Sequence, residues 1–259
     1  LALTLARENC ALALSDVNEI GLQETADKVR ALGVKVTTTK VNVADQAAMH
    51  AWAAQVVKEH GKVNLIFNNA GVALGSTVED TKYEDYEWIM GINLWGVIYG
   101  TKAFLPYLKQ AGEGHVVNVS SIFGLFSQPT QSGYNMTKFA VRGFTESLRQ
   151  ELDIENGGVS ATCVHPGGIK TNIARNARMD QSVLKLTGGK GSTEKMTQQF
   201  EKLFSTSSDQ AAQTILNAVR RDARRVLIGS DAKAADIMQR LLPVVYQKLV
   251  TASFKLSNR

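Results

Sequence analysis

The sequence has little cysteine and no long hydrophobic run. Only two of its 259 residues are cysteine, and both Cys10 and Cys163 lie in apolar, strand-like segments where a free thiol behaves as a small core residue. This pattern argues against a disulfide framework and a metal site, and a reducing, cytoplasmic location is expected. No apolar run approaches the roughly eighteen residues that a membrane span requires, so we expect no transmembrane segment.

The sequence also lacks the aromatic residues that accompany basic clusters in nucleic-acid-binding proteins. The net charge is +5 and the isoelectric point is near 9.1. The densest basic cluster closes a predicted helix over residues 208–219 and consists of Arg220, Arg221, Arg224 and Arg225. Cations at the carboxyl end of a helix complement its dipole, and no aromatic side chain is interleaved with these. We therefore expect no nucleic acid among the partners.

What the sequence does contain is a regular alternation of strand and helix patterns, with 44% hydrophobic and 20% charged residues. The predicted strands occupy residues 10–16, 35–43, 63–68, 115–120, 159–164 and 226–228. The predicted helices occupy residues 1–8, 17–31, 46–60, 82–108, 134–153 and 208–219. Alternating elements of this kind pair in parallel through right-handed crossovers. The predicted fold is α/β: a doubly wound, Rossmann-type, mostly parallel sheet with helices on both faces, in a single domain over residues 1–259.

A serine, a tyrosine and a lysine are spaced for acid/base chemistry. Tyr134 follows Ser121 by thirteen residues, and Lys138 lies four residues further on. Residues four apart project from one face of a helix, so the ammonium can lie beside the phenol and favour its ionised form. An unperturbed tyrosine pKa is about 10 and must fall by roughly two to four for the phenol to act as a base at neutral pH.

Three further segments lie where a parallel sheet binds its ligands. Residues 65–71 form an apolar run that ends in two amides and a glycine, and residues 165–171 turn through Pro166 and two glycines directly after a strand. The carboxyl ends of parallel strands form the ligand-binding edge of such sheets. The third is Asn93, within the predicted helix over 82–108. That helix also carries three glycines expected to break it, Gly91, Gly96 and Gly100.

Together these segments resemble the short-chain dehydrogenase/reductase family, over nearly the whole chain up to about Gly229. Asn68 to Gly71 are similar to its Asn-Asn-Ala-Gly motif, and the Pro166-Gly167 turn with Thr171 is similar to its nicotinamide-contacting segment. The resemblance identifies a catalytic tetrad, Asn93, Ser121, Tyr134 and Lys138.

These four residues have distinct expected roles. Tyr134 exchanges a proton with the substrate oxygen, while Ser121 hydrogen-bonds that oxygen and fixes its position. The resemblance implies that Lys138 lowers the pKa of Tyr134 and holds the nicotinamide ribose, and that Asn93 stabilises a helix distortion that keeps a water in a proton relay. The alternatives are a capping role for Ser121 and a core amide for Asn93.

The predicted cofactor is NAD, with NADP less favoured. Asp16 ends a strand where a carboxylate accepts both adenosine ribose hydroxyls and repels a 2′-phosphate, and Val17 brings no cation to the phosphate. The alternative is that Asp16 caps the next helix. Asn42 stands where the family usually has an aspartate that contacts the adenine, and it keeps an acceptor oxygen. The full set of predicted cofactor contacts is Asp16, Val17, Asn42, Val43, Asn69, Ala70, Gly71, Tyr134, Lys138, Pro166, Gly167, Ile169 and Thr171.

The glycine-rich turn that the family places before its first helix is missing from the sequence, which starts at Leu1 inside that helix. We expect the first strand and this turn, roughly twenty residues, to be absent from the sequence. Without them the chain would lack a pyrophosphate cradle and bind its cofactor poorly. The alternative, which we favour, is that the segment exists in the protein upstream of Leu1.

The substrate is less closely defined by the sequence. The apolar residues after Ser121 and after Gly71 suggest an apolar alcohol or ketone, although they could equally fill the core. Residues 169–204 are polar and weakly periodic, and are expected to form a substrate lid or a surface insertion. The tail, 230–259, has helical periodicity broken at Pro243 and could close the pocket, join subunits of a homodimer or homotetramer, or contact lipid peripherally. The alternative to an oxidoreductase is a catalytically silent nucleotide-binding or interaction protein that retains the fold.

Overall fold

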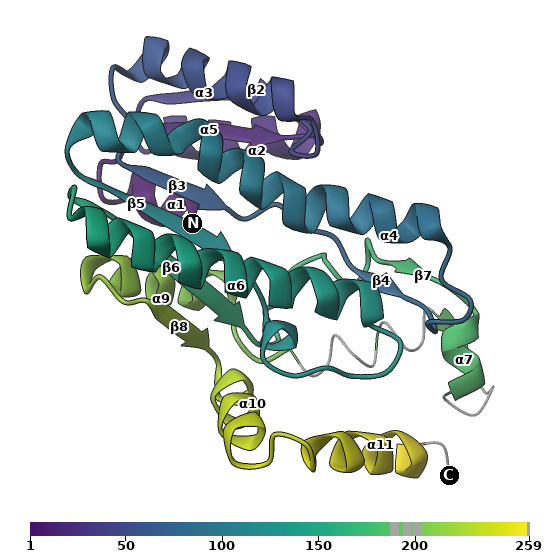
Figure 1. The fold of residues 1–259 in the computed structure, drawn as a ribbon. Coiled ribbons are helices and arrows are strands. Elements are labelled where there is room, and N and C mark those ends of the chain that lie inside the picture. Colours follow the sequence, from purple (N-terminus) through teal and green to yellow (C-terminus); the bar gives the residue numbers. More distant parts are fainter. Residues whose placement is uncertain (187–191, 194–197, 199–203, 258–259) are drawn as a thin grey trace.

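A four-stranded parallel sheet forms the centre of the computed structural model, which describes residues 1–186, 192–193, 198 and 204–257 (Figure 1). Its strands lie in the order β3 (Leu65–Asn68), β5 (Gly114–Val119), β6 (Val159–Pro166) and β8 (Arg225–Ile228). A separate parallel ladder joins β1 (Leu12–Asp16) to β2 (Val36–Lys40). Among the described residues, these strands follow the Rossmann order 3-2-1-4-5-6 without its central first strand and with one strand added at the far edge. The predicted fold class is therefore confirmed.

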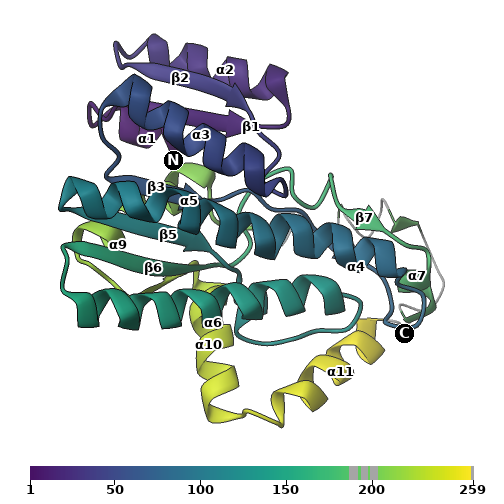
Figure 2. The same cartoon turned by 45° about the horizontal axis from the view of Figure 1, so that its top comes forward.

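Helices cover both faces of the sheet, as the alternating pattern predicts (Figures 1 and 2). One face packs against α3 (Gln46–His60), α5 (Gly96–Ala111) and α6 (Ser132–Glu155). The other face packs against α1 (Ala2–Ala6), α2 (Glu19–Arg30) and α9 (Ser208–Arg220). Each helix presents its apolar stripe to the strands, which are buried between the two layers.

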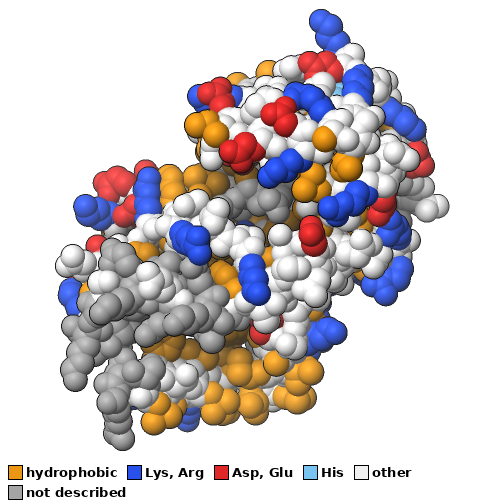
Figure 3. Space-filling model, turned by 180° about the vertical axis from the view of Figure 1, so that it is seen from behind, with side chains coloured by type: hydrophobic (Ala, Val, Ile, Leu, Met, Phe, Trp, Pro, Cys, Tyr) orange, Lys and Arg blue, Asp and Glu red, His pale blue; other side chains and the backbone are white. Residues whose placement is uncertain are grey.

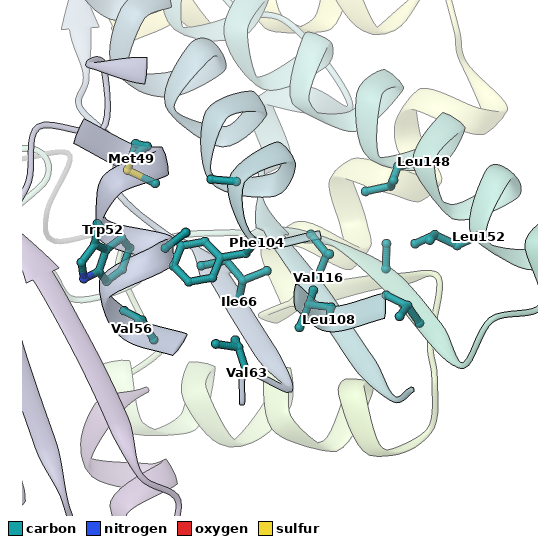
Figure 4. Close-up of a cluster of buried hydrophobic side chains, with 14 of the residues drawn as sticks. Met49, Trp52, Val56, Val63, Ile66, Phe104, Leu108, Val116, Leu148 and Leu152 are labelled. Atoms are coloured by element: carbon teal, nitrogen blue, oxygen red, sulfur yellow. The ribbon is translucent and has the colours of Figure 1, made fainter. Parts of the chain in front are cut away.

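The largest hydrophobic cluster lies between α3, α5 and the sheet (Figure 4). Trp52 of α3 meets Phe104 of α5 edge to face, with ring centroids 5.1 Å apart. Met49 and Leu108 are buried beside them, and Leu152 extends the cluster along α6. Because these helices are held by large buried side chains, the strand ends between them are fixed in position.

The helix predicted over residues 82–108 is continuous, and its glycines do not end it. It consists of α4 (Tyr83–Met90), a π-helical turn η1 (Gly91–Trp95) and α5. At Gly96 a Cβ would lie 2.8 Å from Cγ2 of Val43, and at Gly100 a Cβ would overlap the amide oxygen of Asn68. The prediction that these glycines break the helix is wrong. Gly96 and Gly100 instead allow Val43 and Asn68 to pack closely against the helix.

β2 ends earlier than the strand predicted over residues 35–43. The side chain of Asn42 accepts from the backbone N–H of Ala44, and that of Asp45 accepts from Ala48 and caps α3. These side chain to backbone bonds turn the chain immediately after the strand, which is the usual effect of asparagine and aspartate.

The segment that follows β6 is anchored to the start of the long helix. β7 (Arg178–Met179) pairs with β4 (Leu74–Gly75), and α7 (Ser182–Leu186) follows. The guanidinium carbon of Arg178 lies 3.7 Å from the centroid of the Trp88 ring, and the same side chain pairs with Asp85. Of the predicted lid over 169–204, residues 187–191, 194–197 and 199–203 lie outside the described residues. Strands of two residues leave no pattern in the sequence, so this pairing was not predicted.

The C-terminal residues form an arm that projects from the sheet in Figures 1 and 2. It consists of α10 (Ser230–Leu241) and α11 (Tyr246–Ser257), with Pro243 in the break between them, where the sequence predicts it. In the part of the chain that the structure describes, no helix has the length and apolar character to cross a bilayer.

The arginine cluster at the end of α9 is largely neutralised. Three of its members pair with carboxylates from other parts of the chain: Arg220 with Glu8, Arg224 with Asp153, and Arg225 with Asp236. Guanidinium groups held in this way offer less positive charge to a phosphate backbone than their number suggests.

Candidate active site

Ser121, Tyr134 and Lys138 come together at the carboxyl end of β5. Ser121 follows that strand in extended conformation, and its hydroxyl accepts from the N–H of Phe123 at the start of the 3-10 turn η2 (Ile122–Gly124). The same hydroxyl lies near the Tyr134 phenol, since a hydrogen-bonding influence of Ser121 lowers the phenol pKa. The ammonium of Lys138 lies 5.6 Å from the centroid of the Tyr134 ring and donates to the carbonyl of Val119 at 2.9 Å. The capping role considered for Ser121 is thus real, and it leaves the hydroxyl facing the phenol.

Burial dominates the ionisation of this pair. It raises the pKa of Tyr134 to about 12, against a smaller lowering by the Ser121 hydrogen bond, and it lowers the pKa of Lys138 to about 8. A buried site disfavours any charged form, so it opposes both phenolate and ammonium. The expectation that Lys138 depresses the phenol pKa does not hold in this structure, because desolvation is the larger effect. Tyr134 is therefore a neutral phenol at physiological pH, suited to donating a proton.

Asn93 lies in the π-helical turn and holds the loop that follows β3. Its side chain is fully buried, accepts from the N–H of Val72 at 2.8 Å and donates to the Val72 carbonyl at 2.9 Å. A Cβ at Gly71 would lie 3.3 Å from Oδ1 of Asn93 and 3.5 Å from Nζ of Lys138. The amide therefore joins the helix distortion to the Asn-Asn-Ala-Gly turn, and Gly71 keeps side-chain atoms out of the space beside Lys138.

Asp16 and Val17 lie exposed at the carboxyl end of β1, the same edge of the fold. The carboxylate accepts from the backbone N–H of Asn18 at 2.9 Å, and Asn18, rather than Asp16, caps α2. The alternative role of Asp16 as the helix cap is therefore wrong, because Asn18 accepts from Gly21 in its place. The exposed carboxylate retains acceptor capacity for a ligand.

Two other predicted contacts follow β2. The acceptor oxygen of Asn42 bonds Ala44, and Val43 is half-buried against Gly96. Asn69 and Ala70, after β3, are exposed. The amide oxygen of Asn42, to which the sequence assigns a ligand, is thus already shared with the backbone N–H of Ala44.

The turn after β6 depends on a residue that sequence reasoning missed. The N–H of Gly168 donates to Oδ2 of Asp231, in the first turn of α10, at 2.6 Å. A Cβ at Gly167 would overlap the Asp231 carboxylate. Oδ1 of Asp231 is buried and has no hydrogen-bond partner among the described residues. Asp231 ties the Pro166-Gly167 turn to the C-terminal arm. Gly168 and Asp231 are 63 residues apart in the sequence, and no local pattern links them.

The remaining residues of that turn lie toward the surface. Thr171 is exposed, and its hydroxyl accepts from the N–H of Ile173 at 3.5 Å. Ile169 is half-buried and bridges in parallel to Thr206.

The side of the site beyond Ser121 is aromatic. Its rings form a row of contacts from Tyr134 through Phe123 and Phe126 to Tyr246 of the arm.

Tyr246 is the second contributor that the sequence analysis missed. It is buried, its hydroxyl accepts from the N–H of Ser127 at 3.3 Å, and its ring meets Phe126 edge to face with centroids 6.1 Å apart. The roughly helical spacing of apolar residues in the tail indicates an apolar helix, but it does not identify which residue reaches the site.

Two buried histidines make stability depend on pH. Burial lowers the pKa of His165 and of His115 from 6.5 to about 4. His165 donates from Nδ1 to the Ser121 carbonyl, and His115 hydrogen-bonds Thr162. Because the contact of Nδ1 is a carbonyl, this nitrogen carries the proton in neutral His165.

We expect the free energy of unfolding to fall as the pH drops from 6.5 to about 4, where the unfolded chain binds more protons than the folded one. Each histidine contributes up to roughly 3 kcal/mol to the free energy of unfolding. This contribution is present in full above the pKa of the histidine in the unfolded chain, and it is lost as the pH falls through its pKa in the folded chain. Urea midpoints across this range measure the slope, and His115→Gln with His165→Gln should flatten it. An unchanged slope in that double variant would show that other groups are responsible.

Comparison with known proteins identifies the family. Residues 1–182 match the short chain dehydrogenase family. The chain is 44% identical over 254 residues to SadH of Mycobacterium tuberculosis, described as an oxidoreductase, covering 97% of this chain and 89% of SadH. It is 35% identical over 176 residues to estradiol 17-beta-dehydrogenase 11 of Homo sapiens, covering 68% of this chain and 59% of that protein. The crystal structure of a short chain dehydrogenase/reductase from Burkholderia phymatum in complex with NAD aligns with a TM-score of 0.85 at 26% identity, covering 95% of this chain and 90% of the other. The chain belongs to the short-chain dehydrogenase/reductase family of oxidoreductases, which bind NAD(P).

Proposed function

We propose that the chain transfers a hydride between NAD(H) and the carbon of an apolar secondary alcohol or ketone. The observation that carries this proposal is a cluster of three polar groups: the Ser121 hydroxyl lies near the Tyr134 phenol, and the Lys138 ammonium lies 5.6 Å from the centroid of the phenol ring. A substrate oxygen between the two hydroxyls can accept or return a proton there.

The residues at this edge of the sheet fit a dinucleotide. Gly71 leaves open the space beside Lys138 that a Cβ would fill, so the backbone after β3 can approach a bound ring closely. Asp16 would hold the adenosine ribose, Lys138 the nicotinamide ribose, and the turns at Gly71 and Gly167 the nicotinamide end. When bound, the cofactor would supply the hydride as NADH or accept it as NAD⁺.

The proton is handled by the chain's own residues. In the direction of ketone reduction, Tyr134 donates the proton of its hydroxyl to the substrate oxygen, and burial, which raises its pKa to about 12, keeps that proton in place beforehand. Ser121 donates to the same oxygen and orients it. Lys138, with a pKa of about 8, is mostly an ammonium at neutral pH and stabilises the phenolate that remains.

Asp16 supports NAD over NADP. Its carboxylate is exposed at the end of β1, and position 17 holds valine rather than arginine or lysine. A 2′-phosphate placed beside the carboxylate would therefore be repelled. Val17 is exposed, so replacing it with arginine would add a cation that can pair with the 2′-phosphate.

This assignment is tested by screening apolar secondary alcohols for NADH and NADPH formation. The wild-type protein should oxidise at least one of them with NAD and prefer NAD by about ten-fold or more in kcat/KM, and Asp16→Ser with Val17→Arg should reverse that preference. The matched control is Val78→Arg, an exposed valine remote from β1, which should leave the preference unchanged. Equal use of both cofactors by the wild type would contradict the role of Asp16, and binding of NAD without turnover of any substrate would favour a silent nucleotide-binding protein.

The apolar character of the substrate rests on the aromatic row beyond Ser121. Phe123 meets the Tyr134 ring edge to face, and Phe126 and Tyr246 continue the row of aromatic rings away from the phenol. The segment from residue 169 remains our proposed lid on this side, with its described part anchored through Arg178 on α4.

A further inference from the structure

Exposed apolar side chains are concentrated on the C-terminal arm. Of the 17 large hydrophobic residues that are exposed in the described chain, seven lie within residues 237–256. We call these seven the arm face: Ile237, Leu241, Leu242, Val244, Val245, Leu249 and Leu256. Figure 3 shows a hydrophobic band along the lower edge of the molecule, the edge at which Figure 1 shows α10 and α11. Leu241 is 74% exposed and Leu256 is 68% exposed, values that burial in a core would not leave.

The arm face does not belong to the interior of this chain. On α11, Tyr246 is buried and Val250 and Phe254 are half-buried, so these residues form the side of the helix that faces the protein. Leu249 and Leu256 are seven residues apart and therefore lie on a second side, which is turned away. The helix thus has two apolar sides, and only one of them has a partner in the described chain.

The charge around the arm face has one sign. From Ile237 to the C-terminus the sequence contains no aspartate or glutamate, and its cations are Arg240, Lys248, Lys255 and Arg259. Lys248 and Lys255 are exposed, and their seven-residue spacing places them in a row next to Leu249 and Leu256. Arg240 pairs with Asp236, so Lys248 and Lys255 are the cations that lie next to the arm face on α11.

We propose that the arm face docks on a membrane surface that contains anionic lipid. A helix with leucines on one side and lysines next to them lies in the plane of the interface, with the leucines in the acyl boundary and the ammonium groups at the headgroup phosphates. A second copy of this chain fits less well, because a two-fold contact across α11 would bring lysines of both copies together with no carboxylate to pair with them. This binding is independent of the reaction proposed above.

The arm connects this surface to the active site. Tyr246 begins α11 and contacts Phe126 in the aromatic row. Docking through the arm face would therefore place the aromatic side of the site close to the lipid, from which an apolar molecule could enter.

Vesicle co-sedimentation of the full chain tests the proposal. The protein should bind vesicles of phosphatidylcholine mixed with phosphatidylglycerol. It should bind vesicles of phosphatidylcholine alone at least about five-fold more weakly, because each cation near an anionic surface raises the binding constant about five-fold. Added salt should weaken binding to the anionic vesicles.

Two variants separate the apolar and charged contributions. Leu241→Glu with Leu249→Glu should lower binding to the anionic vesicles by about ten-fold or more, and Lys248→Gln with Lys255→Gln by about 25-fold. Ile154→Glu is the matched control, because Ile154 is 85% exposed on α6 outside the arm and should bind as the wild type does. All of these positions are at the surface, and melting curves verify that the variants fold.

The proposal is overturned if the folded wild-type protein does not sediment with anionic vesicles, or if it binds both vesicle types equally. It is also overturned if the glutamate variant binds as well as the wild type. If vesicle binding is absent and the wild type is an oligomer that Leu241→Glu with Leu249→Glu dissociates, the arm face is an interface between copies. An equal loss of binding in Ile154→Glu would show a nonspecific charge effect instead.

Discussion

Tyr134→Phe is expected to lower kcat by about three orders of magnitude while leaving cofactor affinity and the melting temperature nearly unchanged. The substitution removes the hydroxyl that faces Ser121 and keeps the ring, which packs edge to face on Phe123 with centroids 6.1 Å apart. Proton transfer is lost, whereas the predicted ribose contact at Lys138 remains. Steady-state kinetics with fluorescence titration of NADH separates the two effects.

A matched control is available in Tyr86→Phe. The Tyr86 hydroxyl also bonds a serine hydroxyl, that of Ser132, at 2.9 Å at the beginning of α6, but it is outside the Ser121 pair. This variant should retain most of the wild-type kcat. Turnover by Tyr134→Phe at a rate close to that of Tyr86→Phe would rule out Tyr134 as the proton donor.

Gly100→Ala is expected to lower the free energy of unfolding by about 2–4 kcal/mol, although alanine is the better helix former. A Cβ at Gly100 would overlap Oδ1 of Asn68 and come 3.3 Å from the methyl carbon of Met49. Asn68 cannot move aside, because its Nδ2 donates to Thr101 at 3.0 Å and to Asn118 at 2.8 Å. Thermal and urea unfolding measure the loss.

Gly143→Ala is the comparison for this prediction. Gly143 is in the interior of α6, and a Cβ there would have no neighbour within 4 Å. The same chemical change should therefore stabilise the protein by up to about 1 kcal/mol through helix propensity alone. A similar shift in both variants would mean that contact with Asn68 does not decide the effect at Gly100.

Patterns that repeat along the chain were sufficient to predict the layers of the fold. The helix over residues 46–60 has the predicted bounds, since Asp45 caps one end and Gly61 closes the other. The strand predicted from Val159 continues only two residues further, to Pro166. These signals are local: a cap, a glycine or a run of β-branched residues acts within a few positions of itself.

Features that depend on distant contacts were not predictable. The role of Gly100 depends on Asn68, and that of Asp231 on the turn at Gly168, and neither pair shares a sequence pattern. The ionisation of Tyr134 was misjudged for the same reason. The sequence shows Lys138 one helical turn away, but the burial that raises the phenol pKa comes from elements folded around it.

The amides between β3 and β5 bear on how the chain selects one strand pairing among several. Asn68 and Asn118 are directly opposite each other in the parallel ladder, and Asn118 also donates to Thr145 of α6 at 3.0 Å. A slip of one residue between the two strands would turn one of these amides to the opposite face and separate it from its partner. In the dry interior each abandoned group would cost about 1–3 kcal/mol, whereas the valines and isoleucines around them could pack almost equally well in either register. The polar pair thus excludes misaligned sheets that hydrophobic burial alone would tolerate.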